Sequence, residues 1–477
     1  MKRSLPAVRW PWIAALAAAS AAILCSAPAQ YLGRQQDDII YVIGSQSLAQ
    51  GDYRIFTSIG NPPLVNFPPG FPLLLLPVSA LWGGQPAAYQ AFCALLLASL
   101  PWLLWRWLRR RLGGTEAALA ALLFATSPVT LSQSGAVMSE SAYTAVAVLL
   151  LAALEAGRRG TAGLLLLGLT QLRLAGFSLL PAVLWRPGSR GRARALAASL
   201  LPAAGGLLAW VAWSQRSSHG VGEFHVFSLF YAYRDLGWLH PLKVLADNVR
   251  FYLGEWGGCY LPPAWSAAGA FLGAVLAALA LRGAWRAWPE DRARPAILML
   301  AGTAAMHAVW PWQYDRYLIP LLPWLLWLLA AGTGARARWL LALLLAAQLG
   351  SHTHRWVLGR HSWRTPELAR TYEWVRTRTA PSDAITSALP LRDGFHCARP
   401  SLPLPRPLDA EGFAAQLRRY RVRLVLWQEE LDVGLSLPRD SAAARRLAGL
   451  RAILEDGRRF RLVHEDAVEG ARIYELR

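Results

Sequence analysis

Long apolar blocks alternate with short clusters of arginine along the first three quarters of the chain. We predict membrane-spanning helices in these blocks, because about 20 apolar residues in a helix cross a bilayer. The block 161–185 has basic clusters on both sides and Arg173 in its middle, which predicts a tight hairpin of two short helices with Arg173 near its tip. With this hairpin the count is about eleven helices. The other predicted spans are 10–29, 87–107, 115–133, 138–154, 195–214, 263–281, 295–312, 317–331 and 339–350.

The stretch 30–86 is polar and too broken by proline, glycine and aspartate to be one span, and a second long stretch, 215–262, separates two later spans. We predict that both are long loops on the outer side of the membrane. The orientation follows from the arginine clusters, which the positive-inside rule places in the cytoplasm. Lys2, Arg3 and Arg9 precede the first span, so the N-terminus is predicted inside and the C-terminus outside.

The tail from about residue 352 is charged and lacks long apolar blocks. We therefore predict a transmembrane domain over 1–351 and a small extracytoplasmic α/β domain over 352–477. Thr365, Pro366 and Glu367 form a helix-start pattern, with a cap, proline at the first position and an acid in the first turn. The other predicted elements are a strand at 384–388, a helix capped by Asp409 and reaching Arg419, a strand at 422–427, a helix at 440–455 and a hairpin of 459–464 with 471–476.

Composition supports the membrane interpretation. Of 477 residues, 55% are hydrophobic and 16% are charged, whereas soluble domains carry about 25% charged residues. The net charge of +20 could indicate nucleic acid, but the arginines lie between apolar blocks, so we predict a lipid bilayer and no nucleic acid as partner. A phosphate-binding loop of the P-loop type is absent from the sequence, which disfavours an ATP-driven pump.

Two features of the sequence leave alternatives open. The first apolar segment ends in Ala27-Pro28-Ala29, as a cleavable signal peptide would, although its length favours a retained first helix. Four cysteines are too few for a disulfide scaffold. Cys259 and Cys397 both fall in predicted outer segments and could form a bridge there.

An acidic pair opens the first outer loop, in the run Gln35-Gln36-Asp37-Asp38-Ile39-Ile40-Tyr41. Adjacent carboxylates repel each other, and partial burial raises the pKa of one of them, which suits a proton acceptor. If 37–50 is helical, Tyr41 lies one turn after Asp37 on the same face. The alternative is a solvated helix start, where acids are favourable.

This pair and several later motifs resemble the GT-C fold membrane glycosyltransferases, including the protein O-mannosyltransferase and aminoarabinose-transferase relatives. In that family the first outer loop carries D-[DE]-x-x-Y, followed by a proline-rich turn and a run of leucine. The matching segments here are Asp37-Asp38-Ile39-Ile40-Tyr41, Pro68-Pro69-Gly70-Phe71-Pro72-Leu73-Leu74-Leu75, Met138-Ser139-Glu140, Gln171-Leu172-Arg173-Leu174-Ala175-Gly176-Phe177, Asp315-Arg316-Tyr317-Leu318-Ile319-Pro320 and Tyr372-Glu373-Trp374-Val375.

The resemblance implies a transferase that moves a sugar from a polyprenyl-phosphate donor to a lipid, glycan or protein acceptor, with inversion, on the outer face of the cytoplasmic membrane. Asp37 would be the general base, although Asp38 replaces the commoner glutamate and leaves open which carboxylate acts. Arg173 and Arg316 would bind the leaving phosphate, and Tyr41 and Tyr317 would contact substrate. Alternatives are a structural ion pair for Arg173 and interfacial snorkelling for Arg316.

Glu140 would hydrogen-bond substrate, or hold a divalent cation such as Mg or Mn with Asp37 and Asp38; the alternative is a helix-start acid. Some family members require a cation and others do not, so the metal stays open. Rival functions for the whole chain are a lipid or saccharide flippase and a non-catalytic envelope scaffold. Polar side chains of the second outer loop that could line a cleft are His219, His225, Arg234, His240 and Lys243.

Overall fold

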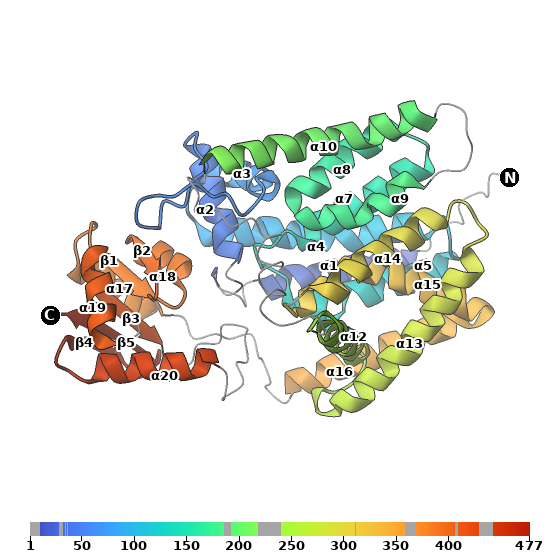
Figure 1. Ribbon diagram of the computed structural model, residues 1–477. Helices are drawn as coiled ribbons and strands as arrows, with labels where there is room; N and C mark the ends of the chain where they lie inside the picture. The colour runs from blue at the N-terminus through green and yellow to red at the C-terminus, as the bar shows by residue number, and fades with distance from the viewer. Residues whose placement is uncertain are drawn as a thin grey trace. The chain divides into compact units, whose positions relative to one another are not determined.

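The computed structural model describes residues 10–27, 32–33, 35, 37–185, 192–217, 240–310, 312–357, 368–405, 409–428 and 442–477. The chain forms two compact units, which are described separately. The first consists of Met1–Ala29, Val65–Leu74 and Ala87–His361, and the second of Gln30–Leu64, Leu75–Pro86 and Ser362–Arg477. Helices build the first unit, and a five-stranded sheet lies at the centre of the second (Figure 1).

The predicted spans of the first unit are present as helices. Additional short helices occur at the breaks between them: α6 (Pro128–Ser132), η3 (Pro263–Trp265), η4 (Asp315–Leu318) and η5 (Gly334–Arg336). The main helices are α1 (Trp10–Ser26), α4 (Pro86–Leu108), α5 (Gly114–Ala125), α7 (Glu140–Glu155), α8 (Arg159–Leu172), α10 (Arg192–Ser217), α12 (His240–Gly258), α13 (Ser266–Ala287), α14 (Arg294–Val309), α15 (Leu322–Thr333) and α16 (Ala337–Val357).

Several of these helices have the properties of membrane spans. In the described part of the chain, four helices are long and apolar enough to cross a bilayer: Pro86–Leu108, Ala193–Ser217, Ser266–Ala287 and Leu322–His352. Shorter apolar helices include Trp10–Ser26 and Gly114–Ala125. Large apolar side chains such as Leu208 and Phe271 are 68% and 73% exposed, which suits lipid as the surrounding solvent. The chain is a multi-pass membrane protein; the count of eleven spans stays a prediction.

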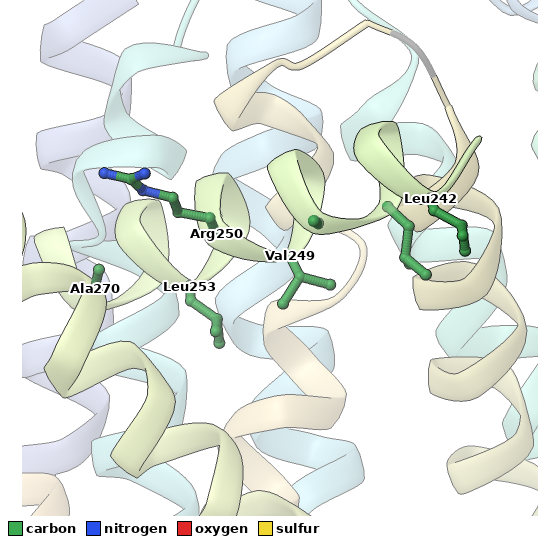
Figure 2. Close-up of a pocket in the computed structure, with 7 residues that line it drawn as sticks. Leu242, Val249, Arg250, Leu253 and Ala270 are labelled. Atoms are coloured by element: carbon green, nitrogen blue, oxygen red, sulfur yellow. The ribbon is translucent and has the colours of Figure 1, made fainter. Parts of the chain in front are cut away.

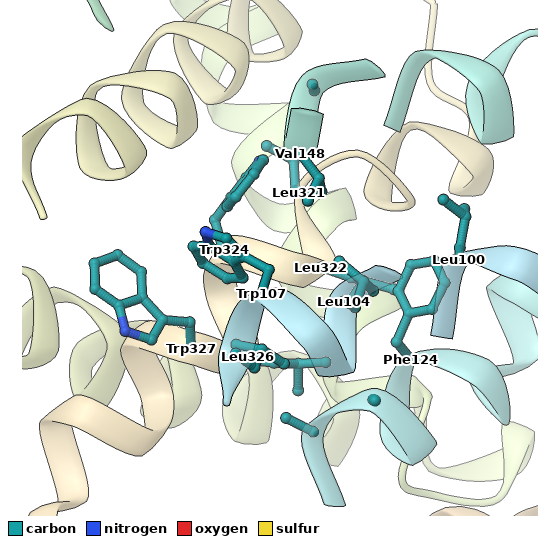
Figure 3. Packing of buried hydrophobic residues seen from close by; sticks show 14 of the residues in the cluster. Leu100, Leu104, Trp107, Phe124, Val148, Leu321, Leu322, Trp324, Leu326 and Trp327 are labelled. Carbon is teal, nitrogen blue, oxygen red and sulfur yellow. The ribbon is translucent and has the colours of Figure 1, made fainter. Parts of the chain in front are cut away.

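The core of the first unit gathers residues from α4, α5, α7 and α15 (Figure 3). Trp107 packs edge to face against Trp324 and Trp327, with ring centroids 5.2 and 5.8 Å apart. The Arg111 guanidinium covers Trp107 and Trp327 at 4.7 and 4.8 Å, and Arg111 also pairs with Glu155. These contacts tie the end of α7 to α4 and α15, which fixes the helix that carries Glu140.

The predicted hairpin around Arg173 is present. α8 ends at Leu172, and Arg173 adopts an extended conformation before η2 (Leu174–Leu179) and α9 (Leu180–Leu184). Arg159 at the start of α8 bonds the carbonyls of Val183 and Trp185 after the turn, so the two arms run antiparallel. Arg173 therefore lies at the tip, as the flanking charges predict.

The segment 215–262, predicted to be an outer loop, contains a helix that was not predicted from the sequence. α12 packs closely on α13, because Gly257 lies against the Gly269 backbone and Gly273 against the Leu253 backbone. A Cβ at either glycine would overlap that backbone, so this contact requires small residues. Residues 218–239, with His219, His225 and Arg234, and the side chain of His240 lie outside the described part of the chain.

The second unit has the strand order β2-β1-β3-β5-β4. β1 pairs in parallel with β2 and β3, and β5 pairs antiparallel with β3 and β4. The predicted strands, helices and hairpin are present, and Asp409 caps its helix by accepting a hydrogen bond from the Gly412 N–H at 2.7 Å. The elements are α17 (Ala369–Arg378), β1 (Ala384–Ser387), α18 (Pro390–Cys397), β2 (Ser401–Pro403), α19 (Ala410–Arg419), β3 (Val422–Gln428), α20 (Ala442–Glu455), β4 (Phe460–Asp466) and β5 (Ala471–Leu476).

Part of the segment 30–86, predicted to be the first outer loop, belongs to this second unit. The segment considered as a helix at 37–50 is α2 (Asp37–Ala49), and the apolar helix α3 (Gly70–Trp82) follows the proline-rich turn. The bridge considered between Cys259 and Cys397 is not formed, since both are buried free thiols. The cap predicted at Thr365 to Glu367 lies outside the described residues.

Candidate active site

The acidic pair lies at the start of α2, where its two carboxylates have different surroundings. Asp37 is half-buried, while Asp38 is 2% exposed. The Asp38 Oδ2 accepts hydrogen bonds from the Gly33 and Gln35 N–H groups at 2.9 and 3.4 Å, and its Oδ1 accepts one from Ile39 N–H at 2.8 Å. Both carboxylate oxygens of Asp38 are thus used to bind backbone N–H groups at the start of α2. Asp37 is the more accessible of the two.

Burial raises the pKa of Asp38 to about 6, and the neighbouring Asp37 charge adds to this effect. The three backbone N–H groups oppose it, because they stabilise the ionised form. Tyr41, one turn after Asp37, is 5% exposed and packed inside the unit. Its contact with substrate stays a prediction.

The raised pKa of Asp38 makes a prediction for stability. A folded-state pKa of about 6 against an ordinary value of 3.8 means that the fold favours the protonated carboxyl. Protonated Asp38 therefore adds to the free energy of unfolding, on the order of 3 kcal/mol in full. This stabilisation is present below about pH 4 and is lost as pH rises through about 6. We expect the unfolding midpoint of detergent-solubilised wild type to fall over this range. The variant Asp38→Asn should lack that pH-dependent component, and equal pH slopes for the two proteins would contradict the assignment.

In the first unit a buried ionic cluster joins the start of α7 to the hairpin tip and to η4. The Glu140 Oε1 lies 2.5 Å from the Arg173 Nη1 and 3.3 Å from the Arg316 Nε. Glu140 and Arg316 are each 2% exposed, and Arg173 also donates to the Ser139 Oγ at 3.2 Å. In this cluster one buried carboxylate contacts two guanidinium groups.

Aromatic rings surround this cluster. The Arg316 guanidinium covers Tyr314 at 4.2 Å, and Arg173 and Arg316 approach the Tyr317 ring at 5.4 and 5.6 Å. His307 of α14 stacks on Tyr317 with centroids 5.0 Å apart. His307 was not predicted from the sequence as a site residue. A lone histidine within the predicted span 295–312 is the signal that could have identified it, since ionisable residues in spans mark functional sites.

Four of the predicted site residues therefore meet: Glu140, Arg173, Arg316 and Tyr317. Snorkelling of Arg316 is excluded by its burial, while the ion pair considered for Arg173 is present. The proline-rich turn also reaches this region, because Gly70 packs directly on the Gln171 backbone. Asp37, Asp38 and Tyr41 belong to the second unit.

A metal site is not evident in the described part of the chain, which has no group of three His, Cys, Asp or Glu side chains suited to a cation. Glu140 is unsuited to hold one, since the guanidinium groups of Arg173 and Arg316 would repel a cation placed beside it.

An apolar groove of about 500 Å³ lies along α12 and α13 (Figure 2). Arg250 is the only charged side chain among its lining residues, which otherwise suit a hydrocarbon chain. The groove is lined by Leu242, Leu245, Ala246, Val249, Arg250, Leu253 and Ala270.

Comparison with known proteins relates this architecture to two membrane enzymes. No protein-family model matches the chain, and no curated protein matches it. ArnT from Cupriavidus metallidurans bound to undecaprenyl phosphate superposes with a TM-score of 0.59 over 98% of both chains, at 14% identity. The apo Archaeoglobus fulgidus oligosaccharyltransferase gives 0.59 over 92% of this chain and 71% of that chain, at 11% identity. The same oligosaccharyltransferase tethered with an acceptor peptide containing the NVT sequon gives 0.57 over 92% and 70%, at 10% identity.

The chain thus has the fold of the GT-C membrane glycosyltransferases, as the sequence motifs predict. The similarity to ArnT extends over nearly the full length of both chains, so it includes the C-terminal domain as well as the helices.

Proposed function

We propose that this chain is a glycosyltransferase that moves a sugar from a polyprenyl-phosphate-linked donor to an envelope acceptor on the outer face of the cytoplasmic membrane. The observation that carries the proposal is the fold shared over 98% of both chains with ArnT, whose structure was solved with undecaprenyl phosphate bound. The acceptor class stays open between lipid, glycan and protein.

The chemistry needs a base, because an acceptor hydroxyl is a poor nucleophile until its proton is removed. We assign this role to Asp37. As the base takes the proton, the acceptor oxygen forms a bond to the anomeric carbon. The bond from that carbon to the phosphate oxygen breaks, and its electron pair leaves with the polyprenyl phosphate. Attack opposite the leaving group inverts the anomeric centre.

The leaving phosphate requires positive charge that is already in place, since fixed charges in a site shielded from water act strongly on developing negative charge. We assign this role to Arg173 and Arg316, with Glu140 holding both guanidinium groups in position. Tyr317 lies against both arginines and limits their movement. Its contact with the sugar or phosphate is part of the same proposal.

The direct test is sugar transfer in membranes that contain the wild-type chain, supplied with a panel of polyprenyl-phosphate sugars. Consumption of one donor with release of polyprenyl phosphate would establish the reaction and identify the donor. A flippase would move the lipid across the bilayer without breaking the bond between sugar and phosphate. A scaffold would leave every donor in the panel unchanged.

The orientation makes an independent prediction. We expect a membrane-impermeant thiol reagent to label Gln46→Cys and cysteines placed within 365–477 from outside, and to leave Arg110→Cys and Arg190→Cys unlabelled in intact cells. Cys25 is the exposed native cysteine and would be replaced first. The opposite pattern would reverse the topology and remove the acidic pair from the outer face.

A further inference from the structure

The segment that carries the acidic pair is held by the C-terminal domain on both sides of α2. All contacts that follow lie within the second unit of the structure. One contact precedes α2, at Leu32 and Gly33, and the other follows it, at Thr57 to Ile59.

The contact before α2 is made with α18. The His396 Nε2 lies 2.8 Å from the Leu32 carbonyl oxygen. A carbonyl can only accept, so the Nε2 carries the proton and donates. Gly33 has φ +100° and packs on the Arg392 side chain, which a Cβ would overlap. The Gly33 N–H in turn donates to the Asp38 Oδ2. A continuous path of contacts therefore runs from α18 to the acidic pair.

The α18 side of this contact is rigid. Arg392 donates to Asp393 at 2.7 Å and to Gln428 at 3.0 Å, and the Tyr372 hydroxyl also donates to Asp393 at 2.8 Å. Arg392 and Asp393 are 3% and 1% exposed. His396 stacks on Tyr372 with centroids 5.2 Å apart. These contacts hold the Arg392 and His396 side chains, which are the two that contact the loop.

The contact after α2 is made with the edge strand β2. Ser401 donates to the Thr57 carbonyl through its N–H at 2.8 Å and its hydroxyl at 2.9 Å, and it accepts a bond from Ile59 N–H at 3.3 Å. Ile59 also packs on the core of the C-terminal domain. The loop thereby covers the β2 edge of the sheet, which would otherwise be open to other strands.

We propose that the C-terminal domain positions the general base, with His396 and Arg392 of α18 as positioning residues that hold Leu32 and Gly33 and, through them, the start of α2. This inference rests on the proposed function of Asp37. It gives the domain a role in the chemical step in addition to any contact with acceptor.

The test compares His396→Phe, which keeps a ring to stack on Tyr372 but removes the donor, with His396→Gln, which can restore a donor at a similar reach. We expect His396→Phe to lower kcat about 10-fold or more with an unchanged KM for the donor, because a small displacement of a catalytic group is costly. Hydrogen exchange of backbone amides in 32–39 should accelerate in His396→Phe and return toward wild type in His396→Gln.

His464→Phe is the matched control, since His464 stacks on Trp374 in the same domain, with centroids 5.0 Å apart. It should leave kcat and exchange in 32–39 as in wild type. Unchanged exchange or unchanged kcat in His396→Phe overturns the proposal. If His396→Phe does not fold, Gly33→Ala disturbs the same contact from the loop side. The same two measurements, kcat and hydrogen exchange in 32–39, then decide the proposal. If wild type transfers no sugar, the proposed function fails, while the exchange comparison still decides whether α18 holds this loop.

Discussion

Replacing Asp37 with Asn is expected to lower kcat for sugar transfer about 10²–10⁴-fold, the usual contribution of a general base. Asparagine keeps the shape of the side chain and removes its ability to accept the proton. The expectation falls on Asp37 because Asp38 is 2% exposed and uses both oxygens to hold backbone N–H groups. Initial rates with the accepted donor, at equal amounts of protein in the membrane, would measure the loss.

Two matched variants make this result specific. Asp52 lies in the same loop, is exposed and pairs with Arg54, so Asp52→Asn should transfer at nearly the wild-type rate. Asp38→Asn places an amide donor where backbone N–H groups donate, and we expect a loss of stability on the order of 1–3 kcal/mol. If Asp37→Asn stays active while a stably folded Asp38→Asn is inactive, the base is Asp38.

Elements with a strong local pattern could be predicted from the sequence. Apolar length predicted the helices of the first unit, and charge on both flanks of 161–185 predicted the break at Arg173 that the structure contains. The Asp409 cap and the hairpin of β4 with β5 were likewise predicted, because each depends on residues close together in the chain.

Other features depend on pairings that no local pattern encodes. α12 mixes charged and apolar residues and lies within 215–262, which was predicted as a loop. The bond from His396 to Leu32 joins residues 364 positions apart. The path from α18 to the acidic pair could not be predicted for the same reason. β2 is only three residues long, too short for an alternating pattern.

The ionic cluster could be predicted in part. Glu140, Arg173 and Arg316 were each identified as candidates from their place in a motif, but their mutual contact follows from how α7, the hairpin tip and η4 pack. A charged residue within or beside an apolar span needs a partner, and the sequence offers several possible partners for each arginine. Packing selects Glu140 for both.

Replacing Glu140 with Gln is expected to destabilise the protein by about 3–5 kcal/mol, because it removes the buried carboxylate that pairs with Arg173 and Arg316. If the two arginines bind the leaving phosphate, added undecaprenyl phosphate should replace the missing carboxylate. Ligand that binds the folded state raises its stability. We therefore expect undecaprenyl phosphate to raise the unfolding midpoint of Glu140→Gln more than that of wild type.

Glu155 provides the control at the other end of the same helix. It pairs with Arg111 and is 15% exposed, so Glu155→Gln should also lose stability but should respond to undecaprenyl phosphate as wild type does. Equal responses of Glu140→Gln and Glu155→Gln would mean that the Glu140 cluster only holds helices together. A larger response confined to Glu140→Gln would instead identify the two arginines as the phosphate site, because only a negatively charged headgroup bound there can compensate for the lost carboxylate.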